Sequence, residues 1–197
     1  MRISGRSEAR VSCTLIGLAV GDCMEYRELE EYEINQIWDI DRTEYVDAIY
    51  ILKSGKLEEK KINQTFYGWP PNEDKIYGPI LKDCYRRNGY FLGGFCDGKL
   101  KAVVLLESKW IGSSKDTLQL KFLHIDQSFR KNGIGRILFE KAVDRARELQ
   151  AKRVYISSCE NKNTVEFYRH MGCEITKEVD KDLYALEPED IHMDLTL

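Results

Sequence analysis

The segments TLQLKFLHI (residues 117–125), DQSF (126–129) and RKNGIGR (130–136) together decide the fold. Apolar residues at alternating positions of the first segment predict a strand. From Gly133 to Gln150 the spacing becomes helical, and the expected buried stripe consists of Leu138, Ala142, Val143, Ala146 and Leu149. Glycines at the strand-to-helix turn let an anion approach the backbone, where the helix N-terminus supplies free N–H groups and a positive dipole end. The stretch therefore predicts a cradle for a pyrophosphate.

Three basic side chains, Arg130, Lys131 and Arg136, add positive charge to this turn. The turn is not a P-loop, because GxxxxGK[ST] is absent, and it lacks the GxGxxG order of a dinucleotide-binding loop. By itself, a GxG before a helix fits a plain turn with solvated basic residues equally well.

A second segment, NKNTVEFYRHMGC (residues 161–173), follows a strand about 25 residues after the turn. Together the two segments resemble the GNAT superfamily of acyl-CoA-dependent N-acetyltransferases. The family pattern is a strand, an (R/Q)xxGxG/A loop, a helix, a strand and then N-x-x-A-x-x-(F/L)-Y-x-x-x-G-(F/C). RKNGIG fits the loop fully, and the second segment departs only at Thr164, where alanine is usual. The resemblance covers residues 90–197.

The resemblance implies an α/β fold with a central mixed, mostly antiparallel sheet flanked by helices. It implies a single domain over residues 24–197, with an acceptor-side variable part (24–89) and an acetyl-CoA-binding core (90–197). Residues 1–23 would form an N-terminal extension. The sequence leaves open whether that extension is an added strand or a start-site artefact.

The resemblance also implies which residues bind acetyl-CoA, the expected co-substrate. The diphosphate would bind the N–H groups of Arg130, Lys131, Asn132, Gly133, Ile134 and Gly135, with Arg136 alongside. The pantetheine arm would pair with the strand end Leu123, His124 and Ile125 like an added strand. Asn161 matches the family asparagine near the pantetheine, and Tyr168 matches the tyrosine that protonates the departing thiolate.

The implied mechanism is direct attack of a neutral amine in a ternary complex, which requires a proton acceptor. Many family members carry a glutamate base eleven residues before the loop arginine, but this chain has Gln119 there. Glu107 is the candidate base; the alternatives are that it only pairs with Lys121 and that ordered water relays the proton. Strand alternation predicts His124 on the face opposite Gln119, as a packed residue and not a base.

The acceptor pocket is expected in the first half of the chain, where aromatic and acidic residues suit a cationic amine. The region comprises Trp38, Asp39, Asp41, Glu44, Tyr67, Trp69 and Tyr77. The same aromatics also fit ordinary packing. A small-molecule or peptide amine is the expected partner, and a homodimer is left open.

Composition excludes several classes of protein. With 30 basic and 33 acidic residues among 197, the chain has a net charge of −3 and no basic excess for binding nucleic acid. No apolar run is long enough to span a membrane. The six cysteines contain no CxxC pair and the three histidines are far apart, so we expect no metal, reduced thiols and a cytoplasmic location.

Other segments predict the remaining elements. They are helix-like residues 30–52 with a break near 41–43, a strand at 57–66, a loop at 68–71, a helix at 73–88, strands at 90–96, 100–107 and 153–158, a helix at 164–171 closed by Gly172, and a strand at 191–197. Two other functions stay open: a catalytically silent acyl-CoA sensor or interaction module, and an ATP-binding protein. The second lacks the lysine–serine pair that such a site uses.

Overall fold

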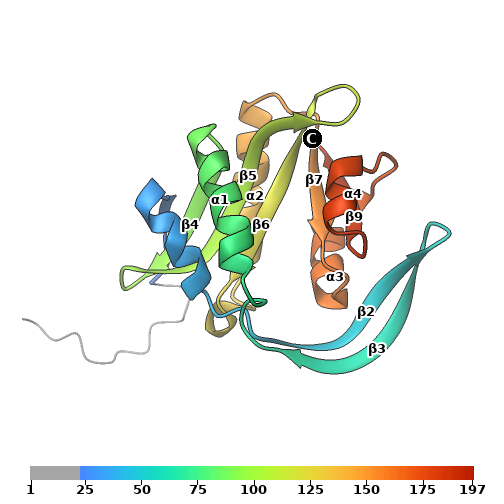
Figure 1. The fold of residues 1–197 in the computed structure, drawn as a ribbon, viewed down its shortest axis with the longest axis horizontal. Helices are drawn as coiled ribbons and strands as arrows, with labels where there is room; N and C mark the ends of the chain where they lie inside the picture. The colour runs from blue at the N-terminus through green and yellow to red at the C-terminus, as the bar shows by residue number, and fades with distance from the viewer. Residues whose placement is uncertain (1–22) are drawn as a thin grey trace, which may run out of the picture.

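The computed structural model describes residues 23–197, so the predicted extension at residues 1–23 lies outside the described residues except for Cys23. A seven-stranded sheet has the order β1-β4-β5-β6-β7-β9-β8, and only β6 and β7 pair in parallel (Figure 1). Its strands are β1 (Glu25–Glu28), β4 (Tyr90–Cys96), β5 (Lys99–Ile111), β6 (Thr117–Ile125), β7 (Arg153–Ser158), β8 (Glu174–Ile175) and β9 (Ile191–Thr196). The predicted mixed, mostly antiparallel sheet flanked by helices is confirmed.

Helices cover both faces of this sheet. The helices are α1 (Glu73–Arg86), α2 (Ile134–Glu148), α3 (Lys162–His170), α4 (Lys181–Leu186) and the 3-10 segments η1 (Glu31–Asp39) and η2 (Gln127–Phe129). One buried core joins the sheet to α2 and α3, and a second joins its other face to η1 and α1. The predicted stripe of α2 is buried except at Leu149, which is 40% exposed just after the helix ends.

The sheet opens between its two parallel strands. β6 pairs with β7 only at Thr117–Arg153, Leu118–Val154 and Gln119–Tyr155, after which the strands diverge (Figure 1). The rest of this edge of β6 has no strand partner among the described residues, so its peptide groups can pair with an extended ligand.

A bulge in β6 changes which side chains share a face. Leu105 of β5 is opposite Phe122, whereas Leu106 is opposite Leu120, so Lys121 is the extra residue. Leu118 and Leu120 therefore lie on the α2 face, while Phe122 belongs to the core on the α1 face. The predicted face of His124 was wrong, because the bulge returns it to the face of Gln119, but its predicted packing is observed against Trp69 and Phe122.

The prediction of a helix-like segment over 30–52 was correct only for its first part. The 3-10 turn ends at Asp39, the predicted break follows, and β2 (Glu44–Lys53) pairs with β3 (Lys56–Phe66) as a long separate hairpin. Alternation with β-branched and aromatic residues in β2 suits a strand, and β3 supplies its backbone partners. The other predicted elements are confirmed, with β5 extended to Ile111.

The cysteines do not all remain reduced. Glu25 faces Phe95 in the β1–β4 pair, which brings Cys23 to Cys96, and the two form a disulfide. Cys84, Cys159 and Cys173 are free thiols. Six reduced cysteines therefore no longer support the predicted cytoplasmic location, which stays a prediction. Among residues 23–197, no helix is both long and apolar enough to cross a membrane.

Candidate active site

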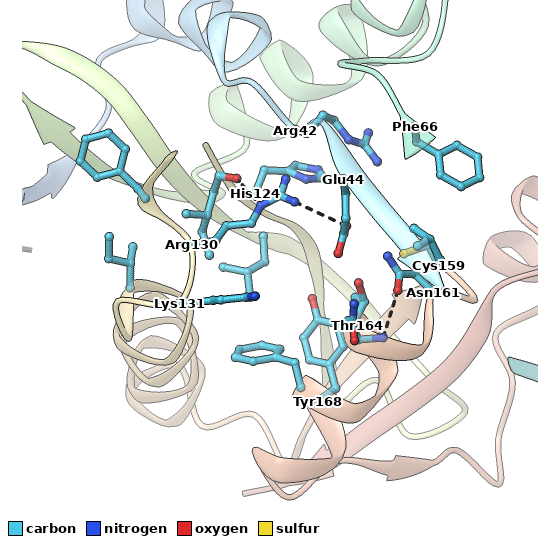
Figure 2. Close-up of a pocket in the computed structure, with 18 of the residues that line it drawn as sticks. Arg42, Glu44, Phe66, His124, Arg130, Lys131, Cys159, Asn161, Thr164 and Tyr168 are labelled. Atoms are coloured by element: carbon cyan, nitrogen blue, oxygen red, sulfur yellow. Dashed lines mark hydrogen bonds and ion pairs between the residues drawn. The ribbon is translucent and has the colours of Figure 1, made fainter. Parts of the chain in front are cut away.

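A cavity of about 850 Å³ occupies the gap between β6 and β7. All residues predicted to bind the cofactor line it except Asn132: Leu123, His124, Ile125, Arg130, Lys131, Gly133, Ile134, Gly135, Arg136, Asn161 and Tyr168. The start of β2 and the loop after β3 form the remaining wall (Figure 2). The structure thus brings the two sequence segments, about 25 residues apart, to one site.

The turn before α2 has the backbone that an anion site needs. Gly133 caps α2 with φ +77°, and a Cβ built there would meet open space. The N–H groups of the first turn of α2 have no partners within the helix and border the cavity. Asn132 shapes the loop instead of lining the cavity, because its side-chain amide donates to the carbonyls of Phe129 and Arg130.

Gly135 favours the site for a different reason. A Cβ at this position would lie 3.1 Å from Cδ1 of Ile125. The glycine therefore lets the first turn of α2 pack closely against the end of β6. The two glycines of the loop have separate functions, one at the turn and one at the helix–strand contact.

The side chain of Arg130 is not a free cation for a phosphate. Its Nε donates to the carbonyl of Ile125 at 3.0 Å, and its Nη1 donates to the carbonyl of Thr43 at 3.2 Å. The same guanidinium lies 3.5 Å from the carboxylate of Glu44 (Figure 2). Arg130 therefore ties the loop to the start of β2, and the side chains of Lys131 and Arg136 remain for an anion.

Tyr168 and Asn161 lie on the wall formed by α3. Tyr168 is 5% exposed and directs its hydroxyl into the cavity (Figure 2). Burial raises the pKa of this hydroxyl, and no hydrogen bond within residues 23–197 offsets that effect, so the phenol stays protonated. The side-chain oxygen of Asn161 accepts from the N–H of Asn163 at 3.0 Å and caps α3.

Glu107 does not line the cavity. The residue is 6% exposed and its carboxylate accepts from Arg87 at 2.9 Å, so the alternative that it pairs with Lys121 is wrong. Burial raises the pKa of Glu107, but hydrogen bonds from Arg87, Cys84 and Ser108 outweigh burial and hold that pKa below its usual value. The ion pair joins α1 to β5, and Gln119 also lies outside the cavity lining.

His124 enters the cavity because of the bulge in β6, which no sequence signal reveals. Its ring contacts Trp69 at 4.7 Å and Phe122 at 4.9 Å between centroids. Burial and the charges of Arg42 and Arg130 lower its pKa well below the usual value, so the imidazole is neutral.

The predicted acceptor region is only partly assembled at the site. Glu44, Tyr67 and Trp69 line the cavity. Trp38 packs edge-on against Trp69 behind the wall, and Tyr77 packs against Phe122. Asp41 accepts from the backbone of Thr43 and from Gln127, and Asp39 does not line the cavity.

Comparisons with known proteins agree with this geometry. The model of the "Acetyltransferase (GNAT) family" matches residues 34–173. An uncharacterized N-acetyltransferase of Methanocaldococcus jannaschii is 24% identical over 165 residues, which cover 79% of this chain and 66% of that relative's length. The structure of nourseothricin acetyltransferase superposes with a TM-score of 0.66 at 19% identity, covering 88% of this chain and 98% of that one. The structure of a putative streptothricin acetyltransferase of Bacillus anthracis, in complex with acetyl coenzyme A, superposes with a TM-score of 0.65 at 17% identity. The match covers 88% of this chain and 97% of that one.

Proposed function

The chain belongs to the GNAT family of acetyltransferases, and on that premise we propose that it transfers an acetyl group from acetyl-CoA to an amine by direct attack in a ternary complex. The observation that carries the proposal is the assembly around one cavity of the Gly133 turn, the unpaired edge of β6 and the hydroxyl of Tyr168.

Each part of the cavity has a role in this proposal. The N–H groups at the start of α2 bind the diphosphate, and Lys131 and Arg136 add charge. The backbone of Leu123 and Ile125 pairs with the pantetheine arm, because no strand of residues 23–197 pairs with this edge of β6 beyond Gln119. Acetyl-CoA supplies an activated thioester. The hydroxyl of Tyr168 donates a proton to the thiolate that leaves.

An amine acceptor fits the side of the cavity formed by the first half of the chain. Tyr67 supplies an aromatic face there, which attracts cations, whereas the carboxylate of Glu44 already lies 3.5 Å from Arg130 and Arg42 lies over the ring of Trp69. Two structural neighbours carry names that contain nourseothricin and streptothricin. These two antibiotics are therefore the first acceptors to assay here.

The binding step is tested by thermal unfolding with acetyl-CoA, CoA and ATP. A ligand at 100 times its Kd stabilises the protein by roughly 2.7 kcal/mol, so both CoA forms should raise the melting temperature and ATP should not. Gly133→Glu places a carboxylate in the cradle and should abolish the shift. Gly98→Glu is the matched control, because Gly98 has φ +70°, equally open surroundings and a place in the β4–β5 turn. Loss of the shift in both variants, or its absence in the wild type, refutes the cradle.

The alternative is an acyl-CoA-binding sensor without turnover. It is favoured by one observation: neither Gln119 nor Glu107 offers a base to the cavity. Release of CoA thiol in the presence of any amine excludes the sensor. Binding without such release, across a panel of amines that includes nourseothricin, favours it.

A further inference from the structure

One guanidinium on the wall of the cavity has no role in the proposed function. Arg42 lies between η1 and β2, and it lines the cavity. Figure 2 shows Arg42 on the same side as Phe66, well apart from Lys131 and from the turn before α2. Because the diphosphate is expected at that turn, Arg42 lies on the side that remains for the acceptor.

The backbone on both sides of Arg42 is held in place. The carbonyl of Asp41 accepts from the N–H of Gln127, in η2 after β6, at 2.7 Å. The hydroxyl of Thr43 accepts from the N–H of Gly68, in the loop after β3, at 3.1 Å. These bonds attach the short segment to two other parts of the cavity wall, so the position of Arg42 does not depend on a ligand.

The guanidinium of Arg42 is held against the wall, but its donors stay free. Its central carbon lies 4.6 Å from the centre of the Trp69 ring, a cation–π contact that supports the side chain. The nearest carboxylate oxygen in residues 23–197 belongs to Glu73 and is 3.9 Å away, which is too long for a hydrogen bond. A guanidinium has five N–H donors, and no acceptor within residues 23–197 bonds to those of Arg42.

Glu73 does not neutralise this cation fully. Burial raises the pKa of Glu73, and the charge of Arg42 opposes that effect only in part. In the pair of Glu107 with Arg87, by contrast, hydrogen bonds outweigh burial and lower the pKa of the carboxyl group. Glu73 also lies outside the cavity lining, so Arg42 presents positive charge to the cavity.

The other basic side chains of the lining are already assigned. Arg130 lies 3.5 Å from the carboxylate of Glu44 and bonds to two backbone carbonyls. Lys131 and Arg136 lie at the turn before α2, where they serve the diphosphate in the proposed function. Arg42 is therefore the lysine or arginine of the described lining that remains for the acceptor.

The charge of Arg42 acts across the gap between the parallel strands. Burial is the main reason why the pKa of His124, on β6, lies well below its usual value, and the charge of Arg42 lowers it further. Burial raises the pKa of Cys159, after β7, and the charge of Arg42 opposes that rise. Arg42 thus lies close enough to both walls to act on a molecule bound between them.

We infer that the acceptor of the proposed acetyl transfer is an amine that also carries a carboxylate, and that Arg42 binds this carboxylate. The inference rests on the proposed function. A guanidinium and a carboxylate form two parallel, charge-assisted hydrogen bonds, and one guanidinium matches a group with a single negative charge. Glu160 and the ring of Tyr67, in the same lining, attract the ammonium group. An acceptor with positive charges alone would instead meet a like charge at Arg42.

The transfer itself balances with such an acceptor. The amine nitrogen bonds to the thioester carbon and the carbon–sulfur bond breaks, while the carboxylate stays unchanged. Of the three protons of the ammonium group, one remains on the amide nitrogen. One proton is lost to water, and the hydroxyl of Tyr168 relays the equivalent of the third to the CoA sulfur. The products are an N-acetylated amino acid and CoA.

Matched pairs of acceptors test the inference. Each straight-chain amino acid from glycine to 6-aminohexanoate is compared with its own carboxamide, which keeps the chain length and removes the negative charge. Release of CoA thiol gives kcat/KM for both members of a pair. At the chain length that reaches Arg42, we expect the amino acid to exceed its amide about 10-fold to 100-fold, the effect of a hydrogen-bonded charge pair. No preference for the carboxylate at any length overturns the inference.

Variants then assign the preference to one side chain. In Arg42→Gln the ratio of the two kcat/KM values should fall close to one, mainly because KM for the amino acid rises. Arg42→Lys keeps the charge without the forked donors and should have an intermediate ratio. Arg86→Gln is the matched control, because Arg86 is exposed, pairs with Glu31 at 2.9 Å and lies outside the cavity lining. The control should keep the wild-type ratio, and an undiminished ratio in Arg42→Gln overturns the role of Arg42.

A binding measurement separates this inference from the proposed function. The N-acetylated amino acids and their carboxamides are titrated into the protein by calorimetry, which needs no turnover. The wild type should bind the acid more tightly than the amide, and Arg42→Gln should abolish the difference; equal binding by the wild type overturns the inference. Thermal unfolding with acetyl-CoA shows that each variant is folded, and Arg42→Lys decides if Arg42→Gln is not. Failure of the wild type to bind acetyl-CoA refutes the proposed function, whereas the calorimetric preference still decides whether Arg42 binds a carboxylate.

Discussion

The hydroxyl of Tyr168 can be removed without disturbing its surroundings. Its ring packs at 5.9 Å from Phe139 and 5.2 Å from Phe167, contacts that phenylalanine would keep. Because no hydrogen bond within residues 23–197 acts on this hydroxyl, Tyr168→Phe should leave the melting temperature and acetyl-CoA affinity nearly unchanged while kcat falls about 10²-fold. Steady-state kinetics and calorimetry check this. The control variant Tyr26→Phe, on β1, removes a tyrosine hydroxyl outside the cavity lining and should change neither kcat nor acetyl-CoA affinity. An unaltered kcat in Tyr168→Phe would exclude the role of Tyr168 as the acid.

The sequence motifs correctly placed the residues whose role depends on local backbone. Gly133 and Tyr168 lie where the loop and the second segment predict them, because each is positioned by its own helix. Arg130, by contrast, bonds to Thr43, 87 residues away, and no local pattern encodes that contact. His124 depends on one extra residue in β6. Spacing along the sequence does not reveal long-range contacts or the pairing register of strands.

At the scale of elements, the β2–β3 hairpin is held across the mouth of the cavity by its contacts with the start of α3. The N–H of Tyr50 donates to the carbonyl of Glu160 at 2.7 Å, and its hydroxyl donates to Glu166 at 2.8 Å. Lys162 also pairs with Glu59 of β3 at 2.7 Å. Figure 1 shows the hairpin running beneath the diverging ends of β6 and β7. These bonds fix one wall of the cavity to α3.

Tyr50→Phe should loosen this attachment by about 1 kcal/mol, the net value of one hydrogen bond. Hydrogen exchange, followed by mass spectrometry, should therefore become faster in residues 44–66 and stay unchanged in the β4–β5 hairpin. Tyr45→Phe is the matched control, because the hydroxyl of Tyr45 bonds to Asn63 within the hairpin and does not reach α3. Equal acceleration in both variants would show that the contact with Glu166 does not hold the hairpin.

The elements of the second half of the chain were easier to predict than those of the first half. The strand at 117–125 and the helix after it have unbroken periodicity and clear turn residues, and the structure has them almost residue for residue. In residues 30–52, Ile34, Ile37, Ile49 and Leu52 mimic one helical stripe, although the chain turns away at Ile40. The strand forms there because β3 offers a partner, and that pairing decides between two patterns that the sequence supports equally.

At the scale of the whole molecule, the disulfide joins the chain before β1 to the end of β4 and closes a loop with a sequence separation of 73. A crosslink over a loop of this length removes unfolded-state entropy worth up to about 4 kcal/mol.

Reduction should therefore lower the free energy of unfolding by up to that amount, measured by urea titration with and without reductant. The Cys96→Ser variant should have the lower free energy of unfolding from the outset, and adding reductant should not change it. Thiol titration of the unfolded chain should count two more thiols after reduction. Because β5 separates β4 from β6, with β1 at the sheet edge beyond β4, acetyl-CoA affinity should survive reduction below the unfolding transition. An unfolding curve identical with and without reductant, together with an unchanged thiol count, would show that Cys23 and Cys96 are not joined.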